Sequence, residues 1–358
     1  MKTGDYVAVS MGKGIGQVIA VLGILAAGAA YVPCGIDVPL QRRRQVYQTA
    51  DVRWVLSDDR PDCRPSWPEE VAVVPLSAAL ASPPLPSCLP VSPQQAMYAI
   101  FTSGSTGTPK GVAVSHGAVA NTIDAVDGLF QFTPADRTIS LSELDFDLSA
   151  YDIFASLSRG AGLVVVDEFQ RRDAHAWVAL LQRWQVTIIS CVPALLDMIL
   201  TAAADKPLPS LRLVMMGGDR IPAEMASRWW SLTGQAAFVG LGGMTEAAIH
   251  STFFVLQPDD TRWSAVPFGQ PLANMHCRIV DDRGRDCPAW VGGELWVSGP
   301  GLALGYLKDP VRSAEKFVED AGRRWYRSGD RVRYWPEGII EYIGRTDQQI
   351  KIRGHRIE

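Results

Sequence analysis

Residues 98–116 read Tyr-Ala-Ile-Phe-Thr-Ser-Gly-Ser-Thr-Gly-Thr-Pro-Lys-Gly-Val-Ala-Val-Ser-His. The apolar residues 98–101 predict a buried strand, and the apolar residues 112–114 predict a return to extended structure. Between them lies a loop rich in Ser, Thr and Gly that ends at Lys110. Glycines let the backbone turn its N–H groups toward an anion, the hydroxyls add donors, and Lys110 adds a positive charge. The stretch therefore predicts a polyphosphate site.

This loop differs from the common P-loop, in which Gly-Lys-Ser or Gly-Lys-Thr enters a helix. Here Pro109 precedes Lys110 and Gly111 follows it, so we expect no helix N-terminus to hold the phosphates. The alternative is a flexible Ser/Gly linker. Buried strands predicted at both ends, together with the Pro-Lys-Gly sequence, favour the phosphate site.

The composition is that of an ordinary globular protein. The chain has 358 residues, a net charge of −4 and 47% hydrophobic residues, which is enough for a large core or for two to three subdomains. The negative charge argues against a general nucleic-acid-binding protein. The cysteines form no Cys-x-x-Cys pair and have no histidine at ligand spacing. This argues against a zinc site or a disulfide framework and favours a cytoplasmic protein with reduced thiols.

An apolar run rich in Ala and Gly at 15–34 has a composition near that of a membrane span. It contains Gln17 and several glycines, is closed by Pro33, and follows no signal-peptide region. We therefore expect a helix packed on a sheet, running into a strand, and no membrane segment.

Strand-like and helical patterns alternate along the first two thirds of the chain. Strands are predicted at 4–10, 30–33, 54–57, 71–74, 138–142, 163–166, 186–193 and 211–216. Helices are predicted from residue 40 and at 116–129, 173–184 and 194–203. Such alternation predicts parallel sheets flanked by helices, here two αβα subdomains. Ligands then bind beyond the carboxyl ends of the strands, where 103–110, 217–219 and 241–246 should converge.

Short strands separated by turns follow from residue 266 onward and predict a small β-barrel subdomain. We expect the αβα layers over about 1–255 and the β-rich subdomain over about 256–345, which together make one core over 1–345. Residues 346–358 then form a hinge.

The stretch Phe-Thr-Ser-Gly-Ser-Thr-Gly-Thr-Pro-Lys-Gly-Val at 101–112 resembles the phosphate-binding loop of the adenylate-forming superfamily. This superfamily contains acyl-CoA synthetases, luciferases and the adenylation domains of nonribosomal peptide synthetases. The resemblance implies ATP and Mg²⁺ as cofactors. The implied phosphate loop comprises Thr102, Ser103, Gly104, Ser105, Thr106, Gly107 and Lys110.

Residues 146–154 resemble the family's Phe-Asp-x-Ser-x-x-x-x-Phe motif, whose Asp pairs with the substrate α-ammonium in amino-acid-activating members. An ammonium that leaves water needs an opposite charge, and Asp147 would supply it. The alternative is an Asp that caps a helix. Its place after the phosphate loop favours the ammonium partner. Acyl- and aryl-activating relatives usually lack this Asp, so it indicates an amino acid.

Residues 237–246 resemble the family's Asn-x-Tyr-Gly-Pro-Thr-Glu motif. The resemblance implies that Thr245 contacts the α-phosphate and that Glu246 helps to hold Mg²⁺, an ion that prefers oxygen ligands. With Lys110 they would be the catalytic residues. Gly242 stands where an adenine-stacking Tyr is usual, and Met244 replaces Pro. A Gly-Gly form of this motif occurs in some cysteine-activating domains.

Residues 326–330 match a Tyr-Arg-Thr/Ser-Gly-Asp motif in which the Asp, here Asp330, accepts both ribose hydroxyls. By resemblance, Gly218, Gly242 and Arg345 complete the nucleotide site. Asp347 matches the hinge residue about which a small C-terminal domain rotates. The chain stops before that domain's lysine motif, so we expect the domain to be absent and the chain alone to be poorly active. It would be either a truncated core or the front part of a domain interrupted by an insertion.

Substrate choice would rest on pocket positions carried over from the family. These are Asp147, Leu148, Tyr151, Ser190, Met215, Gly217, Leu241, Ile249 and His250. The lining is mostly apolar, and Leu148 and Tyr151 would shorten the pocket, so we expect a small amino acid. The Asp-Leu-Tyr opening and the Gly-Gly variant favour cysteine. Ser190 and His250 depart from that pattern and leave alanine, serine or glycine open.

The implied ligase reaction converts an amino acid and ATP into aminoacyl-AMP and pyrophosphate, with transfer to a carrier-protein thiol in secondary-metabolite synthesis. An MbtH-like protein is a further expected partner; a nucleic acid or a membrane is not. Since the substrate carboxylate is already ionised, catalysis needs positioning and charge neutralisation rather than a general base. An acyl- or aryl-CoA ligase is one alternative, against which Asp147 argues. A non-catalytic scaffold is another, against which Lys110, Glu246 and Asp330 argue.

Overall fold

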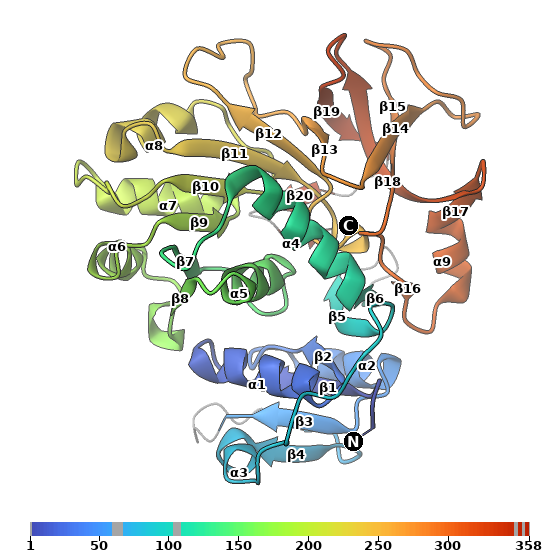
Figure 1. Cartoon of the computed structure of the whole chain (residues 1–358). Helices are drawn as coiled ribbons and strands as arrows, with labels where there is room; N and C mark the ends of the chain where they lie inside the picture. Colours follow the sequence, from blue (N-terminus) through green and yellow to red (C-terminus); the bar gives the residue numbers. More distant parts are fainter. Residues whose placement is uncertain (1, 59–66, 103–108, 347–349, 353–354, 358) are drawn as a thin grey trace.

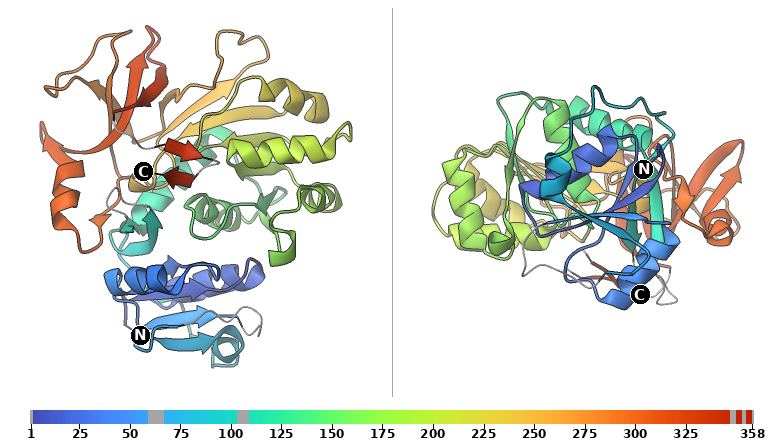
Figure 2. Two further views of the ribbon diagram at one scale, coloured as in Figure 1. Left: turned by 180° about the vertical axis from the view of Figure 1, so that it is seen from behind. Right: turned by 90° about the horizontal axis from the view of Figure 1, so that it is seen from below.

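The computed structural model describes residues 2–58, 67–102, 109–346, 350–352 and 355–357. It contains two seven-stranded sheets, a five-stranded antiparallel sheet and a short terminal hairpin. Figures 1 and 2 show the first strands and helices as a separate layer at one end of the molecule. Among the helices of the described ranges, none combines the length and the hydropathy needed to cross a membrane.

The first sheet has the order β16-β6-β5-β2-β1-β3-β4. Its strands are β1 Tyr6–Ser10, β2 Ala30–Pro33, β3 Trp54–Ser57, β4 Ala72–Pro75, β5 Ala96–Thr102, β6 Lys110–Ser115 and β16 Gly305–Tyr306. Strands β1 to β5 pair in parallel, whereas β6 and β16 are antiparallel to their neighbours. The short helix α3 Leu76–Leu80 follows β4.

The two longer helices of this layer, α1 and α2, pack on opposite faces of the first sheet. Helix α1 (Ile15–Ala26) shares a buried cluster with Val7 and Val9, and α2 (Leu40–Thr49) shares another with Ala8. Successive side chains of a strand point to opposite faces, which places the helices on either side. The apolar run at 15–34 is thus a helix against a sheet, as expected.

The second sheet has the order β13-β12-β11-β10-β9-β7-β8. Its strands are β7 Arg137–Ser140, β8 Gly162–Val165, β9 Ile188–Cys191, β10 Leu213–Met216, β11 Ala237–Gly242, β12 Thr252–Leu256 and β13 Gln270–Pro271. Its helices are α4 His116–Phe130, α5 Leu148–Ser158, α6 Ala174–Arg183, α7 Pro193–Ala203 and α8 Met225–Thr233. Strands β7 to β11 run parallel, while β12 and β13 extend the sheet in antiparallel register.

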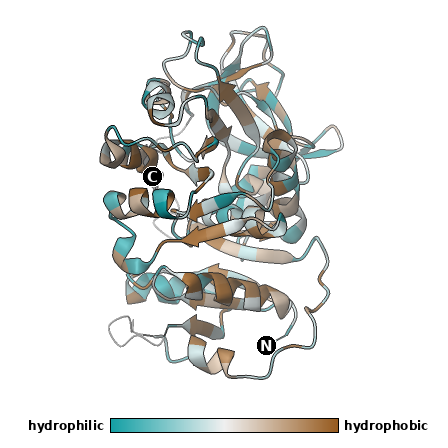
Figure 3. Cartoon of the chain, turned by 60° about the vertical axis from the view of Figure 1, so that its left-hand side comes forward, coloured by the Kyte–Doolittle hydropathy of each residue, from teal (hydrophilic) through white to brown (hydrophobic). Residues whose placement is uncertain are grey.

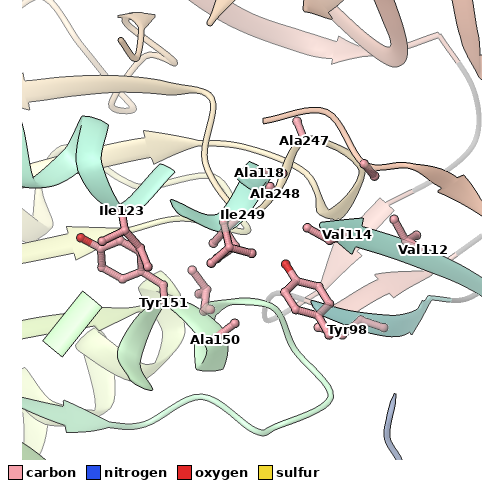
Figure 4. Close-up of a cluster of buried hydrophobic side chains, with 14 of the residues drawn as sticks. Tyr98, Val112, Val114, Ala118, Ile123, Ala150, Tyr151, Ala247, Ala248 and Ile249 are labelled. Atoms are coloured by element: carbon pink, nitrogen blue, oxygen red, sulfur yellow. The ribbon is translucent and has the colours of Figure 1, made fainter. Parts of the chain in front are cut away.

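Helices α4 and α5 lie between the two large sheets (Figure 1), and their side chains share one core with both. Figure 4 shows Tyr151 of α5 beside Ile123 of α4, with Ile249 between α4 and the hairpin that carries Tyr98. Figure 3 shows that the strands of the large sheets are mostly hydrophobic along their length. Burial on both faces explains this composition.

The third sheet has the order β14-β15-β18-β17, with β19 also paired to β18. Its elements are β14 His276–Val280, β15 Gly293–Ser298, α9 Pro310–Lys316, β17 Phe317–Asp320, β18 Arg323–Tyr334 and β19 Ile340–Arg345. The expected β-rich subdomain is thus a curled antiparallel sheet, and the predicted fold class of helix-flanked parallel sheets is confirmed. The last described residues form a hairpin of β20 Ile350–Ile352 and β21 His355–Ile357.

Two contacts tie the β-rich region to the large sheets. Strand β16 leaves this region and pairs with β6, so that Tyr306 lies opposite Val112. Gly269 and Ile340 exchange two backbone hydrogen bonds of 3.1 and 2.8 Å, which join the approach to β13 with β19. Both contacts lie beside the candidate active site.

Candidate active site

Two adjoining cavities open beyond the carboxyl ends of the parallel strands of the second sheet. They share Gly218, Gly243, Asp330 and Arg345 in their walls. The first cavity also includes Asp147, Thr245 and Glu246, and the second is bounded by residues 240–243 and 262–268 and by Tyr342. Segments far apart in the sequence thus meet at one place, where a parallel sheet usually binds ligands.

The predicted phosphate loop connects two antiparallel strands. The β5–β6 ladder ends at the pair Thr102–Lys110, so the loop begins and ends at neighbouring positions. Ser103, Gly104, Ser105, Thr106 and Gly107 lie outside the described residues. Thr102 lines the first cavity. Gly111 has no room for a side chain, since a Cβ there would lie 2.7 Å from the ring of Phe101.

Lys110 and Glu246 form a buried ion pair beside the first cavity. The Lys110 Nζ lies 3.6 Å from Glu246 Oε1, and the two side chains are 6% and 1% exposed. The hydroxyl of Tyr306 donates a 2.8 Å hydrogen bond to the same Oε1, and the Lys110 ammonium lies over the Tyr306 ring. The predicted cation and carboxylate are therefore brought together on one side of the cavity.

Thr245 and Glu246 begin the one-turn helix η3 (Thr245–Ala247) that follows β11. The Glu246 carboxylate supplies hard oxygen atoms of the kind that Mg²⁺ prefers, so this residue fits the ion. Within the described part of the chain, no three His, Cys, Asp or Glu side chains group together as metal ligands. Glu246 would therefore be one protein ligand, and phosphate oxygens and water would complete the coordination, as is usual for Mg²⁺.

Gly242 and Gly243 allow the chain to fold back closely after β11. A Cβ on Gly243 would lie 1.9 Å from the carbonyl oxygen of Ile249, and one on Gly242 would lie 2.3 Å from Thr252 Oγ1. Ser251 donates a backbone hydrogen bond of 2.8 Å to the Gly242 carbonyl. The close return explains why two glycines stand here, a reason that the sequence pattern did not reveal.

The same return holds Ile249 in a strained conformation. Ala248 and Ile249 have φ angles of +48° and +82°. Positive φ is a genuine outlier for a β-branched residue and occurs mainly where the surroundings enforce it. Ile249 and His250 consequently both face the first cavity, as the pocket prediction requires.

Asp147 is the N-cap residue that precedes α5, and its side chain makes no capping hydrogen bond to this helix. It is 6% exposed and lines the first cavity with Leu148. Burial, and then the nearby Asp147 charge, raise the pKa of Tyr98 well above its usual value. The Asp147 carboxylate thus lies near the buried Tyr98 side chain at the cavity wall.

The end of the first cavity is closed by aromatic packing. The His250 ring lies edge-on to Tyr151 at a centroid distance of 5.5 Å, and a Cβ on Gly217 would lie 3.2 Å from His250 Cε1. Tyr151 also contacts Met215, its hydroxyl lying 4.0 Å from the sulfur. Burial lowers the pKa of His250 to about 3. Of the predicted pocket residues, Tyr151, Met215 and Gly217 contact His250 or one another outside the wall of the first cavity, whereas His250 itself lines it.

Ser190 is buried in the same region and also lies outside the cavity wall. Its hydroxyl adjoins the carboxyl of Asp152, whose pKa burial raises well above its usual value. The buried Lys13 ammonium interacts with the Asp152 carboxyl and donates a 3.1 Å hydrogen bond to the Leu141 carbonyl. This polar cluster joins the first layer to the second sheet behind the pocket.

Asp330 and Arg345 form the wall shared by both cavities. The Arg345 Nη1 donates to Asp330 Oδ1 at 2.7 Å and to the Ser328 carbonyl at 3.1 Å. Their side chains are 7% and 11% exposed. The predicted nucleotide residues Gly218, Asp330 and Arg345 are thus brought together. Gly242 and Leu241 line the second cavity instead of the first, and Asp347 lies outside the described residues.

Sequence reasoning missed several residues of these walls. Tyr306, Phe268 and Tyr342 reach the site through strand pairings that join distant segments. Arg42 of α2 reaches the mouth of the first cavity from the first layer. The dipeptide Gly305-Tyr306 carries no local signal that it pairs with β6.

The comparisons with known proteins agree with this geometry. The family model for AMP-binding enzymes matches residues 1–307. The chain is 45% identical over 366 residues to phenyloxazoline synthase MbtB of Mycobacterium tuberculosis, covering all of this chain and 25% of that protein. The chain spans a quarter to a third of the length of the curated relatives that it matches.

Solved structures also match nearly the whole chain. The nonribosomal peptide synthetase FmoA3, in a form with α-methyl-L-serine-AMP bound, is 39% identical with a TM-score of 0.91, and the match covers 97% of this chain and 40% of that one. FmoA3 is also known in an AMPPNP-bound form. An artificially fused adenylation-PCP di-domain, NpsA-ThdA from Klebsiella oxytoca, is 26% identical with a TM-score of 0.89, covering 100% of this chain and 72% of that one.

Proposed function

Since the chain belongs to the AMP-binding enzyme family, as the adenylation-domain core of a nonribosomal peptide synthetase, we propose that it activates a small amino acid with ATP. The products would be aminoacyl-AMP and pyrophosphate. The aminoacyl group would then pass to the thiol of a carrier-protein domain. The 358-residue chain would supply the ATP site and the amino-acid pocket of this reaction.

One observation carries the proposal: one ammonium group and three carboxylates lie around the two adjoining cavities. They belong to Lys110 and to Glu246, Asp330 and Asp147. Glu246 lines the first cavity and is paired with Lys110 behind it. Asp330 belongs to the wall common to both cavities, and Asp147 lines the first. This arrangement suits a nucleotide whose phosphates reach toward Lys110, beside an amino acid held at Asp147.

The roles of the chain's own residues follow from their charges and positions. Lys110 would bind a phosphate oxygen, Thr245 would donate to the α-phosphate, and Asp330 would accept the ribose hydroxyls. Mg²⁺, when bound at Glu246, would neutralise charge on the phosphates. Because the substrate carboxylate is ionised at neutral pH, the site needs to align this nucleophile and exclude water rather than remove a proton.

The short pocket supports a small side chain, with cysteine as the favoured substrate and alanine, serine and glycine as alternatives. The buried rings of His250 and Tyr151 pack against each other next to the first cavity, whose wall includes His250 and Leu148. The FmoA3 relative is known with an α-methyl-L-serine adenylate, which is also a small residue. The proposal also includes an MbtH-like protein as a binding partner and the cytoplasm as the location.

The experiment is amino-acid-dependent pyrophosphate exchange by the full synthetase that carries this chain. A panel of amino acids would include cysteine and its des-amino analogue, 3-mercaptopropionate. We expect cysteine to be activated and the analogue to be rejected strongly, because the analogue has no ammonium group to offer the buried Asp147 carboxylate. Asp147→Ala should narrow the difference in turnover between cysteine and the analogue, because it removes the carboxylate that would recognise the ammonium group.

Three outcomes would contradict parts of the proposal. Equal turnover of cysteine and 3-mercaptopropionate by the unmodified enzyme would refute the ammonium role and favour the acyl- or aryl-CoA ligase alternative. Preference for a bulky aromatic amino acid would refute the short pocket but would leave the ammonium role of Asp147 standing. Absence of Mg-ATP binding in calorimetry would refute catalysis and favour a scaffold.

A further inference from the structure

Two aromatic side chains in the wall of the second cavity have no function in the site as proposed so far. The rings of Phe268 and Tyr342 lie 5.4 Å apart between centroids with an interplanar angle of 31°. Both line the cavity, which also contains Asp330 and Arg345. Phe268 is partly buried, and Tyr342 is 36% exposed. An aromatic surface beside a ribose-binding carboxylate has the chemistry that a purine base requires.

The backbone around Phe268 holds this ring in place. Its neighbour Gly269 has a φ of +80°, and a Cβ there would lie 1.9 Å from the carbonyl oxygen of Phe253. Gly269 and Ile340 exchange two backbone hydrogen bonds, and Tyr342 follows two residues later on β19. Phe268 is therefore fixed relative to Tyr342 by main-chain contacts on either side.

Phe268 also covers the backbone at Gly242. A Cβ built on Gly242 would lie 3.2 Å from Phe268 Cγ and 3.3 Å from Cδ1. The ring thus occupies the space that a side chain at position 242 would enter. Because Gly242 has no side chain, no group from that residue can present an aromatic face to the cavity.

We propose that Phe268 provides the aromatic face on which the nucleotide base stacks, in place of a side chain at position 242. The inference rests on the proposed function, since it assigns part of the same ATP site. The base would lie against Phe268 and Tyr342 in the second cavity, the ribose at Asp330, and the phosphates toward Lys110 in the first cavity. Phe268 has no polar group, so it contributes affinity for the base through stacking rather than through hydrogen bonds.

The experiment measures, by calorimetry in the presence of Mg²⁺, the affinities of ATP and of inorganic tripolyphosphate, which lacks the base and the ribose. Phe268→Leu retains an apolar side chain but removes the ring. We expect it to weaken ATP binding by about 5- to 150-fold, the range measured for loss of base–aromatic stacking, and to leave tripolyphosphate binding unchanged. Phe268→Tyr keeps the ring and should retain the affinity for ATP.

Phe254→Leu is the matched control, because it removes a ring from the same region outside the second cavity. Thermal melting of each variant checks the fold; if Phe268→Leu does not fold, Phe268→Met replaces it with a side chain of similar volume. Unchanged ATP affinity without the ring overturns the inference, as does an equal loss for ATP and tripolyphosphate. Failure of the unmodified protein to bind ATP refutes the proposed function itself, so the two failures are distinguishable.

Discussion

The phenolic hydroxyl of Tyr306 is hydrogen-bonded to the carboxylate of Glu246 at 2.8 Å, although 60 residues separate them. The contact exists because β16 pairs with β6, the strand that begins at Lys110. Glu246 Oε1 therefore faces two donors, the Tyr306 hydroxyl and the Lys110 ammonium 3.6 Å away. These two contacts hold the Glu246 carboxylate in one position at the wall of the first cavity.

Tyr306→Phe should destabilise the protein. A buried hydrogen bond to a charged group contributes roughly 1.5–3 kcal/mol, so we expect a loss of that size in the free energy of unfolding, measured by denaturant titration. Tyr98→Phe is the matched control, because the Tyr98 hydroxyl is buried and has no hydrogen-bond partner among the described residues. Equal effects of the two substitutions would show that the Tyr306–Glu246 bond contributes nothing.

Gly243→Ala should disrupt the return between β11 and β12. The added methyl would meet the Ile249 carbonyl oxygen at 1.9 Å, and overpacking of this kind costs about 1–3 kcal/mol or more. Gly23→Ala in α1 is the control: nothing lies within 4 Å of its Cβ, and Ala in a helix gains about 1 kcal/mol over Gly. Chemical denaturation should show a lower free energy of unfolding for Gly243→Ala and a higher one for Gly23→Ala. A Gly243→Ala variant as stable as the unmodified protein would refute the argument that the chain approaches itself closely here.

Asp330→Asn should weaken AMP binding while leaving the fold intact. The amide keeps the shape of the carboxylate but removes the charge that would accept the ribose hydroxyls. Loss of hydrogen bonds to a charged group costs roughly 1.5–3 kcal/mol, which corresponds to about a 10- to 150-fold rise in Kd. Asp286→Asn, which removes an exposed carboxylate paired with Arg278, serves as the control. An unchanged AMP affinity in calorimetry would remove Asp330 from the nucleotide site.

His250 should make the protein less stable as the pH falls below neutrality. Burial lowers its pKa from 6.5 to about 3, so the folded state keeps the ring neutral while the unfolded chain takes up a proton near pH 6.5. Between these values the unfolded state binds more protons, and the stability falls as the pH falls. One such proton changes the free energy of unfolding by up to about 1.4 kcal/mol per pH unit.

His250→Phe removes this contribution and should give a shallower dependence of the free energy of unfolding on pH between 6.5 and 4. His276→Gln, at an exposed position, is the control, and its free energy of unfolding should depend on pH as steeply as that of the unmodified protein. The measurement is denaturant unfolding at several pH values, and identical slopes for all three proteins would refute the buried neutral imidazole.

Local patterns predicted the parallel sheets and helices α1, α2, α4, α6 and α7, because burial on both faces leaves apolar runs that are visible in the sequence. The resemblance to the family motifs placed Lys110, Glu246 and Asp330 in one expected site. Neither the local patterns nor the motifs predicted helices α5 and α8. The patterns and motifs did not reveal Tyr306 or Phe268, whose positions depend on pairings between distant segments such as Gly269 with Ile340. Nor did they indicate that His250 would stand in front of Tyr151, since this depends on the strained turn at 248–249.

The two glycines at 242 and 243 have a consequence for recombination between synthetases. The first cavity, the proposed amino-acid pocket, is lined mainly by residues 145–250, whereas most of the second cavity is lined by residues 218–268 and 330–345. A donor segment with a larger residue at 242 would bring its Cβ to 2.3 Å from Thr252 Oγ1 and 3.2 Å from Phe268. A functional exchange of specificity must therefore carry Thr252 and Phe268 with the pocket, and its downstream junction belongs after residue 269.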